Sequence, residues 1–198
     1  DAFNNKFLKG KFYDFNGIRI PRIENTNLMK SVYEDSLKIY TEYGDDYSHT
    51  IVDVLEKKLP EGTYCYIGKN GEDITVKEGF TVLDAGAWIG DFSAYAAKKG
   101  AHVYAFEPSP VNIKMLNETI NYNKDSSSGK ITIVPFGLGE REEVLNFMEN
   151  EAEGNTGANT FNIDNESSTT KLQVTTVDSW VAKNNIKKID KINANNIK

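Results

Sequence analysis

Between residues 80 and 134, runs of apolar residues alternate with stretches of helical spacing. Thr81–Ala85, His102–Phe106 and Ile131–Val134 are short apolar runs typical of buried strands. Phe92–Lys99 and Pro110–Asn123 have the spacing of amphipathic helices, and the second begins with proline, which suits a first helical turn. This alternation predicts a parallel sheet of βαβ units. The right-handed crossover rule then places the first strand centrally, the second beside it and the third outside.

Beyond Gly139 the pattern loosens. Val144–Met148 and Leu172–Thr175 predict a hairpin, Val177–Asn184 predicts a helix, and Ile189–Ile192 begins a further strand. A doubly wound sheet that ended there would lack strands on one side of its centre. We therefore expect residues 80–198 to form a Rossmann-like α/β domain that is incomplete at its C-terminus, with its open side exposed or covered by another copy of the chain.

The first 62 residues have a different pattern of apolar and polar positions. Helical spacing is found in two segments, one from Leu28 to Tyr40 and one from Ile51 to Leu59, after a short alternating stretch over Phe12–Ile20. We expect residues 1–62 to form a small, mainly helical cap. Residues 63–79 should form a β-hairpin that leads into the core, because Asn70-Gly71 is typical of a tight hairpin turn.

Composition narrows the functional classes. The 198 residues are 39% hydrophobic and 26% charged, as in ordinary globular proteins. The net charge is -6 and no basic run is present, which disfavours nucleic acid as a partner and favours a small or neutral substrate molecule. The single cysteine, Cys65, excludes an internal disulfide and a cysteine metal cluster, so we expect no metal. The lone cysteine is consistent with a reducing cytoplasm, and the apolar runs are too short for a membrane helix, so we expect a cytoplasmic protein.

The candidate functional residues lie at the ends of the predicted strands. Asp84 ends the first strand, and Gly86 and Gly90 lie in the turn that leads to the next helix. Ligands of open α/β sheets bind at the carboxyl ends of strands, where glycine lets the backbone approach them closely. Glu107 ends the second strand, 23 residues after Asp84, where an acid can accept hydrogen bonds from both ribose hydroxyls. We expect this acid to face solvent in a cofactor crevice.

This spacing alone does not distinguish between cofactors. A dinucleotide fingerprint requires G-x-G-x-x-G, and Trp88 stands where its second glycine would be if Gly86 were the first. S-adenosylmethionine has no phosphate, and its positive ammonium group suits an acid such as Asp84. The residues favour S-adenosylmethionine, and an NAD-dependent oxidoreductase is the first alternative.

Three segments resemble a known family. They are Asp84–Gly90 (DAGAWIG), Val103–Pro110 (VYAFEPSP) followed by Asn112, and Val174–Trp180 (VTTVDSW). The first two resemble the signature motifs of the FkbM family of methyltransferases, and the third is similar to its V-T-T-L-D segment. The resemblance, over about residues 80 to 192, implies an S-adenosylmethionine-dependent O-methyltransferase that acts on hydroxyls of sugars or natural products.

The resemblance also implies which residues contact the cofactor. The expected set is Asp84, Ala85, Gly86, Ala87, Ile89, Gly90, Glu107, Pro108, Ser109, Gly137 and Leu138. The last two lie in Pro135–Gly139, which by resemblance would pass near the adenine. The alternative for this segment is an ordinary glycine-rich turn.

One segment departs from the family. FkbM sequences continue into a strand that reads roughly F-I-K-x-D-x-E-G, whereas Asn193 and Asn195 stand here for Lys and Asp and no Glu-Gly follows. In such folds this strand lies beside the methyl group. The second alternative is therefore a degenerate domain that binds S-adenosylmethionine, or nothing, and serves as an interaction module.

The sequence identifies no catalytic base. Of the two histidines, His102 opens a strand and is expected at the surface, and His49 in the cap is a weak candidate. Asp178 lies at a predicted helix start, which favours a structural role. Three tyrosines of the cap, Tyr40, Tyr43 and Tyr47, fit a helix core better than a substrate mouth.

Overall fold

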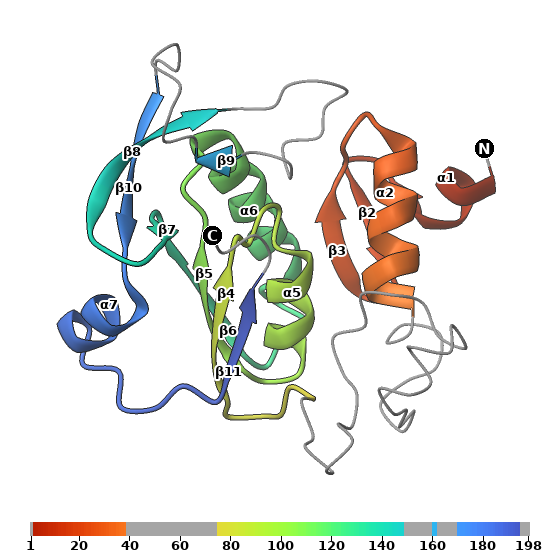
Figure 1. Ribbon diagram of the computed structural model, residues 1–198. Coiled ribbons are helices and arrows are strands. Elements are labelled where there is room, and N and C mark those ends of the chain that lie inside the picture. Colours follow the sequence, from red (N-terminus) through yellow and green to blue (C-terminus); the bar gives the residue numbers. More distant parts are fainter. Residues whose placement is uncertain (1, 39–74, 149–159, 162–169, 195–198) are drawn as a thin grey trace, which may run out of the picture.

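The computed structural model describes residues 2–38, 75–148, 160–161 and 170–194, which form three sheets and their flanking helices (Figure 1). The central sheet is parallel, with the strand order β11-β4-β5-β6. Its strands are β4 (Thr81–Ala85), β5 (His102–Phe106), β6 (Lys130–Val134) and β11 (Lys191–Ala194). The predicted order is confirmed, and the strand predicted from Ile189 pairs with the other side of β4.

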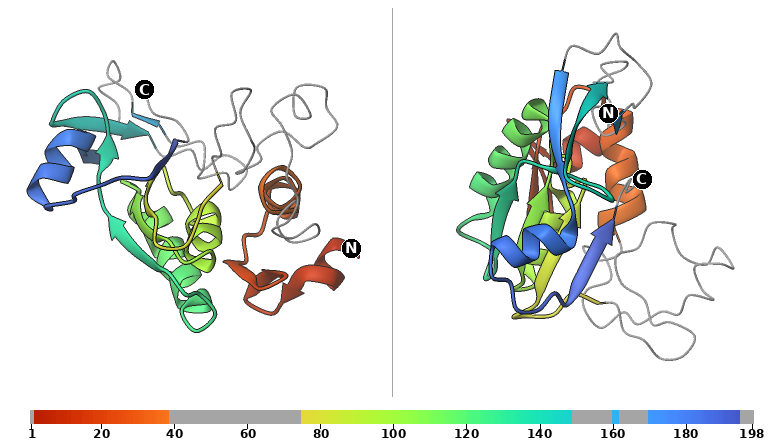
Figure 2. Two further views of the ribbon diagram at one scale, coloured as in Figure 1. Left: turned by 90° about the horizontal axis from the view of Figure 1, so that it is seen from below. Right: turned by 60° about the vertical axis from the view of Figure 1, so that its left-hand side comes forward.

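Helices cover both faces of this sheet. Helices α5 (Asp91–Lys98) and α6 (Pro110–Asn123) lie on one face, and α7 (Val177–Lys183) lies on the other (Figures 1 and 2). Alternate residues of β5 face opposite sides: Ala105 packs in a cluster with Leu116 of α6, whereas Phe106 packs against Trp180 of α7. These helices start and end within one residue of the predicted positions.

A second, smaller sheet stands beside the central one. Its strands are β7 (Gly137–Leu138), β8 (Glu143–Met148), β9 (Thr160–Phe161) and β10 (Thr170–Thr175), in the order β7-β10-β8-β9. Strands β8 and β10 are antiparallel, which confirms the predicted hairpin. Helix α7 follows β10 directly, with Thr176 as its N-cap and Asp178 in its first turn, so the predicted helix start is confirmed.

The described part of the N-terminal segment contains a small sheet as well as helices, and the expected second helix of the cap lies outside the described residues. It contains α1 (Ala2–Phe7), β1 (Leu8–Lys9), β2 (Phe12–Phe15), β3 (Ile18–Pro21) and α2 (Thr26–Val32), and a π-helical turn follows over Tyr33–Leu37. The three strands form an antiparallel sheet. The alternating Phe12–Ile20 stretch is therefore a hairpin, whose turn residues Asn16 and Gly17 have φ values of 51° and 91°. Asn-Gly is the strongest short signal for such a turn.

Several predictions for this half of the chain lie outside the described residues. They are the helix over Ile51–Leu59, the hairpin around Asn70-Gly71, and the positions of Cys65, His49, Tyr40, Tyr43 and Tyr47. The proposed boundaries at residues 62 and 79 stay predictions.

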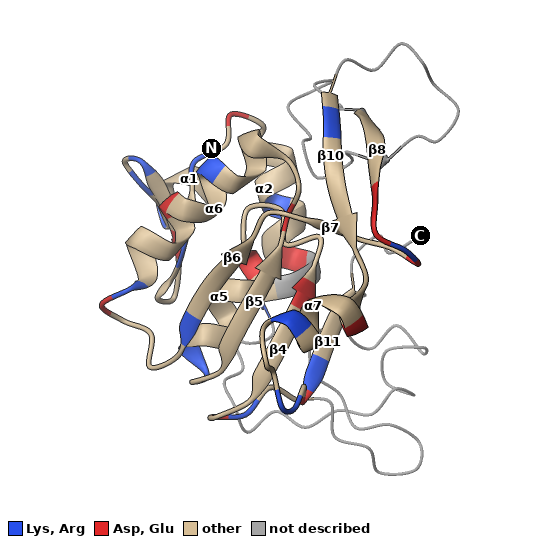
Figure 3. Ribbon diagram, turned by 90° about the vertical axis from the view of Figure 1, so that its left-hand side faces the viewer, with Lys and Arg blue, Asp and Glu red and all other residues tan. Residues whose placement is uncertain are grey.

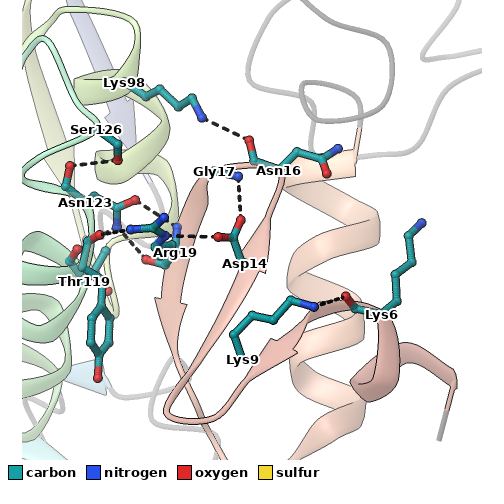
Figure 4. A network of polar contacts seen from close by, with 11 residues as sticks. Lys6, Lys9, Asp14, Asn16, Gly17, Arg19, Lys98, Thr119, Asn123 and Ser126 are labelled. Carbon is teal, nitrogen blue, oxygen red and sulfur yellow. Dashed lines mark hydrogen bonds and ion pairs between the residues drawn. The ribbon is translucent and has the colours of Figure 1, made fainter.

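The N-terminal sheet packs on α5 and α6, on the side of these helices that faces away from the central sheet (Figure 2). Polar contacts join the two parts (Figure 4). The Arg19 backbone N–H donates to Asn123 Oδ1 (2.9 Å), and Asn123 Nδ2 donates back to the Arg19 carbonyl (2.6 Å). The Arg19 side chain reaches Asp14 and the Tyr122 carbonyl, and Lys98 Nζ donates to the Asn16 carbonyl. Apolar residues of both parts form one continuous cluster.

Among the described residues, every helix is too short or too polar to cross a membrane. Within the same residues, no group of three or more His, Cys, Asp or Glu is placed to hold a metal ion.

Candidate functional site

Asp84 lies at the carboxyl end of β4 and is 1% exposed. Each of its carboxylate oxygens accepts one hydrogen bond. Ser93 Oγ, from the first turns of α5, donates to Oδ2 (2.6 Å), and Asn193 Nδ2, from β11, donates to Oδ1 (2.9 Å). Burial raises the pKa of Asp84 from 3.8 to about 7, against the two hydrogen bonds, which lower it.

Glu107 follows β5 and is 4% exposed, so the expectation of a solvent-facing acid is wrong. Its Oε1 accepts from the Ser109 backbone N–H (2.9 Å) and from Asn112 Nδ2 (3.2 Å), and its Oε2 accepts from the Trp88 backbone N–H (2.8 Å). Burial raises its pKa, and these three hydrogen bonds lower it in part. The carboxylate therefore ties the β4 turn to the start of α6.

The turn between β4 and α5 contains three residues in the left-handed conformation. Gly86, Trp88 and Gly90 have φ values of 77°, 49° and 85°. The Gly86 and Ala87 N–H groups both donate to the Phe106 carbonyl, which fixes the turn against the neighbouring strand. Trp88 is a bulky residue in a conformation that favours glycine or asparagine, so its backbone is strained. Such strain is typical of ligand-binding turns.

Gly90 also permits the close packing of two helices. A Cβ atom at this position would lie 2.4 Å from Leu116 Cδ1 of α6. Thr119 Oγ1 of the same helix donates to the Ile89 carbonyl (2.5 Å). The turn is thus held from both sides, by β5 and by α6.

The third predicted segment lies farther along the sheet. Gly137 and Leu138 form β7, which pairs in parallel with β10, so they belong to a short strand rather than to an irregular turn. Leu138 packs in the apolar cluster with Phe106 and Trp180 on the α7 face. Their expected position near an adenine stays a prediction.

The structure adds three residues that are not in the expected set of cofactor contacts, although Asn112 follows the second motif and Asn193 lies in the strand expected beside the methyl group. Ser93 and Asn193 hold Asp84, and Asn112 holds Glu107. Asn112 and Ser93 could have been found from their places in the first turns of the helices that follow the two acids. The contact of Asn193 with Asp84 could not be found in this way, because it depends on the register in which β11 pairs with β4. The two residues lie 109 positions apart in the chain.

The site is acidic. Asp84 experiences the negative charges of Asp91, in the first turn of α5, and of Glu107. Figure 3 shows acidic positions where the arrows of β4 and β5 end. His102 lies at the opposite end of β5, partly exposed and within 3.0 Å of Thr132 Oγ1, so it is not part of this site.

Two acids at neighbouring carboxyl strand ends, with a glycine-containing turn after the first, are an arrangement typical of α/β domains that bind nucleoside cofactors. Residues 84–193 match the Methyltransferase FkbM domain, which is more than half of the chain. The chain belongs to the FkbM methyltransferase family. No curated protein sequence matches it.

Two solved structures show limited similarity. The Pyrococcus abyssi tRNA (uracil-54, C5)-methyltransferase in complex with S-adenosyl-L-homocysteine is 25% identical, with a TM-score of 0.25, over 30% of this chain and 14% of that protein. A putative transferase from Pyrococcus horikoshii is 17% identical, with a TM-score of 0.28, over 69% of this chain and 59% of that protein. The chain spans less than two thirds of either protein, and similarity at this level supports no argument about its ligand.

Proposed function

We propose that this chain is an S-adenosylmethionine-dependent methyltransferase with a Rossmann-like cofactor domain, and that it methylates a hydroxyl of a sugar or another small molecule. Family membership supports methyl transfer as the reaction. The observation that carries the cofactor proposal is the pair of buried acids, Asp84 and Glu107, held at adjacent strand ends on either side of the Gly86–Gly90 turn.

The residues present fit this cofactor. Among the described residues, Asp84 is hydrogen-bonded only by the neutral Ser93 and Asn193, so an anionic Asp84 suits a positively charged ligand group. A carboxylate has about four acceptor positions. Glu107 uses three of them internally, which leaves about one on Oε2 for a ribose hydroxyl. Direct bonding of both hydroxyls would require Asn112 to move away.

S-adenosylmethionine would supply an activated methyl group on its sulfonium. The contribution of the chain is then mainly to bind, orient and exclude water, since alignment of the reacting groups accounts for a large share of the rate in such reactions. The Gly86–Gly90 turn, Glu107 and Pro108–Ser109 would hold the nucleoside. The catalytic base stays unassigned.

Calorimetric titration with S-adenosylmethionine, S-adenosylhomocysteine and NAD tests the proposal. We expect binding of the first two and none of NAD. Glu107→Ala should weaken S-adenosylmethionine binding at least tenfold, because one charge-assisted hydrogen bond contributes about 1.5–3 kcal/mol and ~1.4 kcal/mol gives a factor of ten. Binding of NAD alone would favour an oxidoreductase instead.

The acceptor is tested by activity. Formation of S-adenosylhomocysteine from S-adenosylmethionine should require a small hydroxylated acceptor such as a sugar. Tight binding without transfer to any member of a broad acceptor panel would favour the degenerate interaction module. Transfer to RNA would contradict the small-molecule acceptor that the net charge of -6 favours.

A further inference from the structure

The two hydrogen-bond partners of the buried Asp84 are neutral groups that contain both donors and acceptors. The Ser93 hydroxyl can donate or accept, and the Asn193 amide offers a donor nitrogen or, after a flip, an acceptor oxygen. Both partners can therefore satisfy a carboxylate, and both can satisfy a protonated carboxyl that must itself donate. A lysine at position 193 would favour the charged form, because its ammonium group is positive and offers no acceptor to a protonated carboxyl.

The charges around Asp84 act in the same direction. The groups that face it come from α5 (Ser93 and Asp91), from the end of β5 (Glu107) and from β11 (Asn193). Among the described residues, the charged members of this set are both acids, and no Lys, Arg or His is present in it. The ends of β4 and β5 and the start of α5 thus bring three acids close together, and none of the described groups that face Asp84 is a cation.

We propose that Asn193, through its hydrogen bond to Asp84, allows the Asp84 carboxyl to hold a proton before a ligand binds and to release that proton when a positively charged ligand binds. The inference rests on the proposed function, and it assigns Asn193 as a positioning residue that acts through Asp84. The proton balance is simple: the O–H bond of the Asp84 carboxyl breaks, the proton passes to solvent, and the ligand cation compensates the carboxylate.

The direction of the pKa shift agrees with this geometry. Burial raises the pKa of Asp84 from 3.8 to about 7, and the charges of Asp91 and Glu107 raise it as well. Below pH 7 the Asp84 carboxyl should be protonated before a ligand binds, and a cationic ligand must displace the proton. Its affinity should therefore rise with pH up to about 7.

The test is the binding of S-adenosylmethionine to the full chain between pH 5.5 and pH 7.0. The upper limit keeps the ligand's own α-amino group protonated, since such groups titrate near pH 7.7–8.0. We expect the affinity to increase about tenfold across this range, because a fully linked proton changes affinity tenfold per pH unit. Titration in buffers with different ionisation enthalpies should show release of about one proton at pH 6.

Variants at position 193 separate the role of Asn193 from a general charge effect. Asn193→Lys places a cation beside Asp84, so the affinity should vary less than about twofold over the same pH range. Asn117→Lys is the matched control, because it adds the same charge at an exposed position on α6 and should keep the tenfold dependence. The readout is the change of affinity with pH. The affinity at a single pH is no readout, because the new lysine ammonium group competes with the ligand cation for Asp84.

Carboxyl NMR on the ligand-free protein gives an independent measurement. One carboxyl should titrate near pH 7, and its signal should be absent in Asp84→Asn. If every carboxyl titrates below about pH 5, or if affinity is independent of pH, the inference is wrong and the proposed function stands. If S-adenosylmethionine binds at no pH while the NMR titration is as expected, the proposed function fails and the ligand part of the inference fails with it.

Discussion

Replacement of Glu107 by alanine should destabilise the fold as well as weaken cofactor binding. The carboxylate accepts hydrogen bonds from the backbone N–H groups of Trp88 and Ser109 and from Asn112 Nδ2. Ser109 and Asn112 are buried, and Ser109 is 0% exposed. A buried donor left without a partner costs about 1–3 kcal/mol, so loss of two such partners should lower the free energy of unfolding by about 2–6 kcal/mol.

Urea denaturation of wild type and variant at pH 7 measures this effect by linear extrapolation. The free energy of unfolding of Glu107→Gln should lie between those of wild type and Glu107→Ala. The glutamine keeps one acceptor oxygen, but its amide N–H₂ group would face an N–H donor. Glu140→Ala is the control, since Glu140 is an exposed acid and its removal should change stability by less than about 0.5 kcal/mol. If Glu107→Ala behaves like Glu140→Ala, the carboxylate does not hold the β4 turn, and the reasoning about this site is refuted.

Three further predictions concern stability. Gly90→Ala should lower the free energy of unfolding by about 2–4 kcal/mol, because it adds a clash with α6 to the strain of φ +85°. The control Gly79→Ala has a similar φ of +79° but no atom within 4 Å, so it should lower stability by only about 1–2 kcal/mol. Thermal melting of both variants tests this difference. Asn123→Ala should cost about 1–3 kcal/mol in urea, because it removes both hydrogen bonds to the Arg19 backbone; a cost near zero would mean that apolar packing alone holds the hairpin. Because the pKa of Asp84 is raised to about 7, the chain takes up a proton on folding between pH 4 and pH 7. The free energy of unfolding should therefore fall with rising pH in this range, by at most about 1.4 kcal/mol per pH unit. The same pH dependence in Asp84→Asn would contradict this.

The central sheet could be predicted from the sequence because its signals are local. Each of β4, β5 and β6 is a short apolar run, and Pro110 and Ser109 start α6 by their own chemistry. The two acids of the site were found because they stand directly after such runs. The N-terminal hairpin was missed although Asn16-Gly17 is a turn signal, because the helical spacing that follows dominated the interpretation.

The rest of the site depends on contacts that no local pattern contains. Asn193 meets Asp84 only because β11 pairs with β4 in one register, and a shift by one residue would turn the Asn193 side chain to the other face. The burial of Glu107 results from donors on two different elements, the β4 turn and the start of α6. A strand-end acid in a sequence therefore indicates a ligand crevice, but it does not reveal how much of its hydrogen-bonding capacity the protein itself uses.

Helix α5 is buried over seven consecutive residues, from Asp91 to Ala97. A helix on the surface of a two-layer domain would expose one side, but here the central sheet covers one side and the N-terminal hairpin covers the other. An excised fragment limited to the family match, residues 84–193, would place Tyr95 and its neighbours in water. We therefore expect the folding unit to be wider than the region of family similarity, and soluble expression of residues 84–193 should require the hairpin to be kept with them.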